Sequence, residues 1–231
     1  MSKQAVDIWG DFLAAIEVKP EIVSFSDDEL VTTIEVSNTY HLRRYMNVII
    51  DGIVYEVISM TGNSIVVTGV LTPLEIIIQN PFYIHGTPMN TNVLLGDIGN
   101  FKEKSPLNYL YEMLTDAKDL RPGALTERRV NIVAFILDNS EGDWTATEHY
   151  DEVIDRLSTY VDILEHKILS YPKFNADEMD KIVRISHANF GKFMDKQGYV
   201  NHIFDEVYSG IEIRLTLCVK TSLGCENQIS N

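Results

Sequence analysis

Cysteine and long apolar runs are both scarce in this chain. Cys218 and Cys225 are its two cysteines, and their spacing differs from the Cys-X-X-Cys of a metal or redox site. Cys218 lies inside an apolar strand pattern, so we expect a reduced, buried, structural thiol. No apolar run reaches the roughly 18 residues that a membrane-spanning helix needs. The first 17 residues place Asp and Glu among their apolar positions, unlike a secretory signal. We expect synthesis in the cytoplasm and no membrane association.

Basic residues are also few, with 19 Lys and Arg against 34 Asp and Glu and a formal net charge of −15. Binding nucleic acid through its phosphates depends on Lys and Arg, so the composition argues against a protein that grips DNA or RNA. Two interpretations of the acidity stay open. It keeps the protein soluble, or it forms a wall that repels phosphate and leaves DNA free to slide.

Catalytic motifs are missing as well. The sequence contains no GxSxG, HExxH, P-loop or GxGxxG pattern. Of its six histidines, His149 comes nearest to a metal site because Asp151 and Glu152 follow it. Those carboxylates open a predicted helix, where they complement the helix dipole, and this explains them without a metal. We predict no catalytic residue, no metal and no cofactor.

The first hundred residues predict a helix followed by an antiparallel sheet. Residues 3–17 place apolar side chains on one helical stripe. Residues 29–70 alternate like strands, and Asp51-Gly52 favours a type I′ hairpin turn. Residues 74–79 extend that sheet until Asn80-Pro81 interrupts it. Residues 89–100 read as an irregular crossing segment.

The second half predicts helices that alternate with strands. Ser105-Pro106 begins a predicted helix that runs to about residue 119. Residues 128–138 form an apolar strand, expected at the centre of a sheet. Thr145 and Glu148 have the spacing of a capping box, and a long helix follows as far as Tyr171-Pro172. The last third reads as strands, of which residues 210–220 alternate as a half-exposed strand.

The predicted fold class is therefore α+β, with an antiparallel β-meander module joined to a helix-on-sheet module. The sequence contains no repeats and no low-complexity tracts. The expected organisation is an N-terminal helix or arm at 1–28, a β-rich module with connector at 29–100, an α+β module at 101–225, and a loose tail at 226–231.

Several residues are candidates for contacts between subunits. The helix that carries Trp9 docks on its own chain or on a partner. The two arginine doublets, Arg43-Arg44 and Arg128-Arg129, either pair with the excess carboxylates or dock on an acidic neighbour. That neighbour could be another copy of this chain. The aromatic pair Phe82-Tyr83 and the alternating strand predicted at 210–220 offer further surface for contacts between subunits. The candidates are Trp9, Arg43, Arg44, Phe82, Tyr83, Arg128, Arg129, Glu212 and Arg214.

Five segments carry a resemblance to a known family. They are PLNYLYEMLTD, RRVNIVAFILDN, EHYDEVIDRLSTYVDILEHKIL, ISHANFGKF and GIEIRLTLCVK. In order and texture the chain, over roughly residues 72–221, resembles neck and tail-terminator-like proteins of tailed bacteriophages. It is similar to those of crAss-like and other Bacteroidetes phages.

The resemblance implies an α+β virion protein without catalytic residues or cofactors. Such subunits form a sixfold or twelvefold ring of identical copies between the portal and the tail. They contact portal or adjacent ring proteins and let DNA pass through the lumen without specific binding. The β-meander is larger than in the smallest terminators, which favours a longer head-tail connector or tail-barrel ring.

Two alternatives come from other classes of protein. One is a small-molecule enzyme or hydrolase with a pocket near residues 80–88 and His85 or His187 as its base. The other is a single-strand nucleic-acid binder built on the β-meander, which the net charge of −15 opposes.

Overall fold

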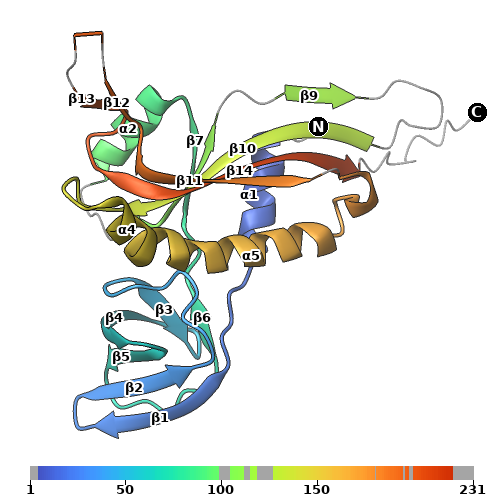
Figure 1. The fold of residues 1–231 in the computed structure, drawn as a ribbon. Coiled ribbons are helices and arrows are strands. Elements are labelled where there is room, and N and C mark those ends of the chain that lie inside the picture. The colour runs from blue at the N-terminus through green and yellow to red at the C-terminus, as the bar shows by residue number, and fades with distance from the viewer. Residues whose placement is uncertain are drawn as a thin grey trace, which may run out of the picture.

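The computed structural model describes residues 5–98, 105–111, 115–118, 127–179, 181–194, 196–197 and 200–220. Figure 1 shows a curled β-module below a second sheet, with a long helix lying between them. Helices and largely antiparallel sheets are both present, and the α+β class is confirmed. We refer to the two parts as the β-module and the sheet module.

The β-module is a six-stranded antiparallel sheet in the order β1-β2-β5-β4-β3-β6. Asp51 and Gly52 join two of its strands with φ angles of 50° and 83°, as the predicted type I′ turn requires. Cross-strand pairs such as Ile34 and Ile65 point into its core. The predicted antiparallel module is confirmed, with β3, β4 and β5 adjacent in sequence order, although β2 pairs with β5 rather than with β3. Its strands are β1 (Ile22–Asp28), β2 (Val31–Val36), β3 (Asn47–Ile50), β4 (Ile53–Thr61), β5 (Ser64–Thr68) and β6 (Ile76–Ile78).

The sheet module has the strand order β11-β14-β10-β8-β7, with β9 paired to β10. The strand predicted at 128–138 lies at its centre, as expected. Only β7 and β8 pair in parallel among these ladders. Its strands are β7 (Phe82–Gly86), β8 (Leu107–Tyr111), β9 (Thr115–Lys118), β10 (Glu127–Asn139), β11 (Ile182–Phe190) and β14 (Tyr208–Lys220). A separate hairpin pairs β12 (Lys192–Met194) with β13 (Val200–His202).

Two helices cover one face of the sheet module. They are α1 (Ala5–Ala14) and a long helix made of α4 (Ala146–His149), a π-helical turn η1 (Tyr150–Ile154) and α5 (Asp155–Ser170). The capping box at Thr145 and Glu148 is present and begins the long helix as predicted. A short 3₁₀ turn, η2 (Ala176–Glu178), follows. The other face carries α2 (Pro88–Asp97) at one end.

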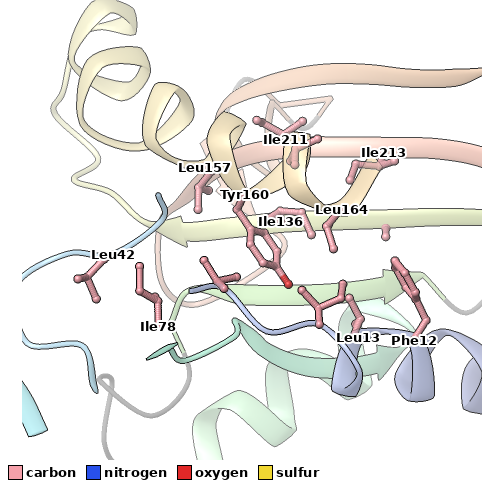
Figure 2. Packing of buried hydrophobic residues seen from close by; sticks show 14 of the residues in the cluster. Phe12, Leu13, Leu42, Ile78, Ile136, Leu157, Tyr160, Leu164, Ile211 and Ile213 are labelled. Atoms are coloured by element: carbon pink, nitrogen blue, oxygen red, sulfur yellow. The ribbon is translucent and has the colours of Figure 1, made fainter. Parts of the chain in front are cut away.

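The core is continuous from the β-module into the sheet module. Apolar residues of α1, α5, β10 and β14 form one cluster with the interior of the β-module. Figure 2 shows the ring of Tyr160 directed away from α5, toward the side where Leu13 lies. Each fully buried aliphatic side chain of this core stabilises the fold by about 1.5–3 kcal/mol. The buried residues of α5 are Leu157, Tyr160, Val161, Leu164 and Ile168.

The prediction of a helix after Ser105 is wrong for the residues that the structure describes, because they form the strands β8 and β9. Residues 107–111 form β8, which lies between β7 and β10. Leu107, Leu110 and Tyr111 are three and four residues apart, which resembles a helical stripe. A strand buried on both faces needs no alternation, so its apolar residues match either period. Residues 112–114 and 119, also in this prediction, lie outside the described residues.

The prediction of an irregular crossing segment from residue 89 is also wrong as far as residue 97, because residues 88–97 form α2. Residues 99 and 100, also in this prediction, lie outside the described residues. Thr87 caps this helix by accepting a hydrogen bond from Asn90 N, and Pro88 occupies its first turn. Its exposed apolar residues do not form the usual inward stripe, which explains why periodicity missed it. Two segment boundaries also differ from expectation. Residues 22–28, expected as part of an arm, form β1 of the β-module, and β7 belongs to the sheet module.

Candidate functional site

A buried cluster of charges joins the two modules. Asp138, at the end of β10, is almost fully buried. Its Oδ2 lies 2.9 Å from Nε of Arg43 and 2.7 Å from Nη2 of Arg156. Burial would raise the pKa of Asp138, but the two guanidinium groups and the Ser105 hydroxyl lower it overall. The carboxylate is therefore ionised and holds an arginine of each module.

His41 of the β-module lies at the same junction and contacts Arg156. Its Nε2 lies 2.8 Å from the Gln79 carbonyl oxygen, its ring packs against Tyr160, and its own carbonyl accepts from Nη1 of Arg156. Full burial lowers its pKa to about 4. A neutral imidazole that no solvent reaches has no route to a substrate, so the cluster serves to join the modules.

A second buried cluster pairs a histidine with a serine, the residue types of a nucleophile and its base. Ser209 Oγ lies 2.8 Å from Nδ1 of His149 and 3.0 Å from Oγ of Ser140. Both His149 and Ser209 are completely buried. Burial also lowers the pKa of His149. A nucleophile must reach its substrate, so this pair is structural in the conformation seen here.

The third polar group lies on the face of the sheet module that is turned away from α5. Glu212 is buried, and its carboxylate lies 2.7 Å from Nε2 of His187 and also pairs with Arg214. The cross-strand register places Arg129 on this same face. Of the sequence candidates, Arg129, Glu212 and Arg214 are therefore brought to one sheet face.

The enzyme alternative needed a pocket near residues 80–88 and a histidine base. A cavity of about 120 Å³ does lie at the module junction, lined by Met46, Asn47, Gln79, Asn80, Phe82, Ser105 and Pro106. Neither His85 nor His187 is among these lining residues. His85 lies on β7 and His187 on β11, the two outer strands of the sheet order, which places them about 19 Å apart.

Neither a metal centre nor a membrane segment is found in the part of the chain that the structure describes. No group of three His, Cys, Asp or Glu side chains there has the arrangement to hold a metal ion. None of the helices within those residues is both long and apolar enough to cross a bilayer.

Three of the interface candidates make contacts within the chain. Trp9 is fully buried and docks on its own fold, the first of the two alternatives. Arg43 pairs with Asp138, and Tyr83 donates its hydroxyl to the Val6 carbonyl oxygen at 3.1 Å. These side chains hold α1 and the β-module to the sheet.

Apart from the buried Glu212, the other candidates keep part of their surface in solvent. Arg44 is exposed, donates to the Ile58 carbonyl oxygen and lies over the Tyr45 ring. Phe82, Arg129 and Arg214 are exposed, and Arg128 is half-buried. Arg129 and Arg214 share one face of the sheet module, while Arg44 belongs to the β-module.

Five exposed apolar side chains of the β-module lie at its β1–β2 and β3–β4 turns and on the segment that joins them. Leu74 is 87% exposed and Leu30 is 76% exposed, far above the usual value for leucine. They come from the β1–β2 turn, the start of β4, and the segment between β5 and β6. We call this set the β-tip patch: Leu30, Ile53, Val54, Val70 and Leu74.

Two hydrogen bonds donated by backbone N–H groups anchor the segment that carries part of the β-tip patch. Gly69 N donates to the Leu30 carbonyl oxygen at 2.8 Å, which fixes one end of the connecting segment beside the β1–β2 turn. Glu75 N donates to Oδ1 of Asp51 at 2.9 Å, which fixes the other end beside the β3–β4 turn. Six residues separate these anchors, so the hairpin tips lie at most about 20 Å apart. The segment bridges them with apolar side chains.

A second exposed apolar surface lies on α2. Thr91 and Leu95 hold the helix to the sheet module, while Met89 on the outer side is 78% exposed. Val93 and Leu94 are exposed beside it. We call Met89, Val93 and Leu94 the α2 patch. Figure 1 shows α2 and the β-module hairpins at opposite ends of the molecule.

Neither patch was among the interface candidates drawn from the sequence. The β-tip residues are ordinary strand or turn residues until the sheet is assembled, and α2 was not predicted. The capping signal Thr87-Pro88 was available to find the helix. Comparisons of the chain with protein-family models, with curated proteins and with solved structures find no match.

Proposed function

We propose that this protein is a structural subunit of a ring in the neck or tail of a tailed bacteriophage. It would act as a head-tail connector or tail-barrel protein around the DNA channel of the virion. The observation that carries the proposal is the pair of exposed apolar patches at opposite ends of one chain. A ring is built from heterologous contacts, in which one face of a subunit meets a different face of the next.

Two further observations support a structural rather than a catalytic role. The charged and polar clusters at Asp138 and His149 are buried and join elements of the fold. The net charge of −15 would give the lumen of a ring an acidic wall, which repels phosphate and lets DNA pass. The resemblance over residues 72–221 favours the same function.

The test is assembly in the presence of the natural neighbours. The full chain is purified alone and together with the portal and the ring proteins encoded beside it, then examined by light scattering and negative-stain microscopy. We expect rings of six or twelve copies, at least when the neighbours are present. A chain that stays monomeric beside both the portal and the adjacent rings would contradict the proposal.

The enzyme alternative has its own readout. A pH-dependent hydrolytic activity of the purified chain that disappears in His85→Ala or His187→Ala would favour that alternative. Since the two histidines lie on opposite edges of the sheet, only one of the substitutions should affect a single site.

A further inference from the structure

The strand β1 leaves one of its edges open. It forms the first edge of the β-module sheet and, among the described residues, pairs only with β2. Figure 1 shows it at the outer end of the β-module, away from the sheet module. Every residue from Val23 to Asp28 is exposed, with Val23 at 61% and Phe25 at 42%. A row of unpaired backbone groups beside exposed apolar side chains is a template for one further strand.

The register of β1 shows which backbone groups face the open edge. The two-residue turn Glu29-Leu30 joins β1 to β2, so Asp28 and Val31 form the hydrogen-bonded pair that closes the hairpin. Hydrogen-bonded and non-hydrogen-bonded pairs alternate along an antiparallel ladder. The N–H and C=O groups of Phe25 and Asp27 therefore point away from β2. They are available to pair with an added strand.

The two faces of β1 differ in character. Phe25 lies opposite the fully buried Ile34, so its side chain is on the inner face of the curled sheet. Ser24, one residue earlier, is on the outer face and donates to the carboxylate of Glu35 at 2.8 Å. Asp28 shares this outer face, because side chains alternate along a strand. An added strand would therefore meet an aromatic ring on one face and carboxylates on the other.

The charge of the β-module restricts what this edge binds. Residues 22–78 contain seven carboxylates and two arginines, of which Arg43 is held by the buried Asp138. The seven are Asp27, Asp28, Glu29, Glu35, Asp51, Glu56 and Glu75. A second copy of β1, or an anionic lipid surface, would bring like charge to this edge and be repelled. A segment that carries Lys or Arg is attracted.

A bulge limits the open edge at its start. The register shifts between Ile22 and Ser24, so Val23 is an extra residue without an opposite partner. Bulges and edge charges are devices by which proteins prevent identical edges from pairing. Together with the carboxylates, the bulge opposes self-pairing of β1. The regular part, from residue 24 to residue 28, stays open to a partner of the opposite charge.

We propose that the open edge of β1 binds an extended, basic segment of a different protein, which adds to the sheet as a further strand. In this segment apolar residues alternate with Lys or Arg, because Phe25 lies on one face of the sheet and Asp28 on the other. Main-chain hydrogen bonds to Phe25 and Asp27 give the affinity, and the two faces give the specificity. The inference goes beyond the proposed ring function and does not depend on it, since the binding site lies within one copy of the chain.

The test uses a synthetic peptide as the probe. It is fluorescein-labelled, about as long as β1, and alternates valine with lysine. Its binding to the purified full chain is measured by fluorescence anisotropy at low and high salt. We expect saturable binding that weakens as the salt concentration increases, because exposed charges are screened.

Two altered peptides separate the contributions of charge and backbone. One has glutamate in place of lysine. The other keeps the lysines and is N-methylated at two consecutive central residues, which removes N–H donors from both of its edges. Each should bind at least about tenfold more weakly than the first peptide, because it lacks either the opposite charge or the hydrogen bonds of a strand.

Phe25→Lys tests the edge in the protein itself. The lysine removes the apolar contact and repels the basic peptide, so binding should weaken at least about tenfold. Val54→Lys is the matched control, because Val54 is an exposed apolar residue of β4, which lies three strands from β1 in the sheet order. At physiological salt it should bind within about twofold of the wild type, since distant exposed charges are screened. Circular dichroism checks that both variants fold.

Amide hydrogen exchange locates the bound peptide. Binding should slow exchange at Phe25 and Asp27, whose N–H groups point to the open edge. The N–H groups of Ser24, Ser26 and Asp28 already pair with β2 and should change less. Protection that appears elsewhere in the chain, with none at Phe25 or Asp27, would overturn the proposal.

Further results would also overturn it. If the N-methylated peptide binds as tightly as the unmodified one, charge alone attracts it and no strand is added. If the basic peptide does not bind at concentrations up to about 1 mM, the edge accepts no such strand. If the wild type self-associates in light scattering and Phe25→Lys abolishes this, β1 pairs with a second copy. The ring function has its own test in the assembly with the portal and adjacent ring proteins, so failure of one does not imply failure of the other.

Discussion

Asp138 accepts a hydrogen bond from Arg156 across the module junction, with 2.7 Å between Oδ2 and Nη2. Nε of Arg43, from the β-module, lies 2.9 Å from the same oxygen. Asp138 belongs to β10, Arg156 to α5 and Arg43 to the β2–β3 connection. One buried carboxylate therefore fixes three elements relative to one another, and it restricts movement of the β-module relative to the sheet.

Asp138→Asn should destabilise the protein by about 3–5 kcal/mol, because it leaves two guanidinium groups beside a neutral amide in a buried place. The measurement is urea unfolding at pH 7. Asp162→Asn is the matched control, since Asp162 is an exposed carboxylate that pairs with Arg184. Loss of this exposed ion pair should lower the free energy of unfolding by about 1 kcal/mol or less. Equal effects of the two substitutions would mean that the junction cluster is no stronger than a surface ion pair.

The buried His41 should make stability depend on pH. Its folded pKa of about 4 lies below the ordinary value of 6.5, so the unfolded state binds more protons between these values. Stability from this group is complete above pH 6.5 and falls as the pH decreases toward 4, by about 3 kcal/mol in total. His149, whose pKa burial also lowers, adds to the loss in the same direction.

His41→Gln should reduce this pH dependence, because the amide does not titrate and is able to donate to the Gln79 carbonyl oxygen. Urea unfolding at pH 7.5, 6, 5 and 4.5 gives the slope for each protein. The control is His166→Gln, which makes the same exchange at an exposed position of α5. An unchanged slope in His41→Gln would show that the buried imidazole is not responsible.

Local chemistry in the sequence predicted those elements whose signal lies within a few residues. Asp51-Gly52 alone determines its hairpin, because only residues that tolerate positive φ fit both central positions. Thr145 and Glu148 form their capping box without help from the rest of the fold. The apolar run of β10 follows from its central place. β14 is a strand as predicted, but the expectation that residues 210–220 are half-exposed is wrong. One of its faces meets α5, and Glu212 and Cys218 on the opposite face are buried as well.

The remaining features depend on contacts between residues far apart in the sequence. β8 is a strand because β7 and β10 pair with both of its edges, although its leucine spacing also fits a helix. The β-tip patch exists because a segment from residue 69 to 75 joins two hairpin tips. Asp138 gave no signal of its own, since its arginine partners are 18 and 95 residues away. Such features become visible only in the folded chain.

Leu164→Ala should cost about 2–5 kcal/mol of stability, because Leu164 is fully buried between α5 and the sheet and its removal leaves a cavity. Thermal and urea unfolding measure the loss. Leu169→Ala, five residues further along the same helix, removes the same atoms from an exposed side chain. It should change stability by no more than about 0.5 kcal/mol. A large effect at Leu169 would mean that this side of α5 is covered in solution.

Gly210 lies where β14 passes β10 so closely that no side chain fits. A Cβ at this position would lie 2.0 Å from the Ile136 carbonyl oxygen, which belongs to the backbone of the neighbouring strand. Gly210→Ala must therefore push the two central strands apart, and it should destabilise the protein by more than about 3 kcal/mol or prevent folding. Gly96→Ala on α2 is the control, since its Cβ would meet nothing within 4 Å. Replacing this helical glycine should raise stability by about 0.5–1 kcal/mol. Soluble yield and urea unfolding compare the two variants, and a well-folded Gly210→Ala protein of wild-type stability would contradict the close approach of β10 and β14.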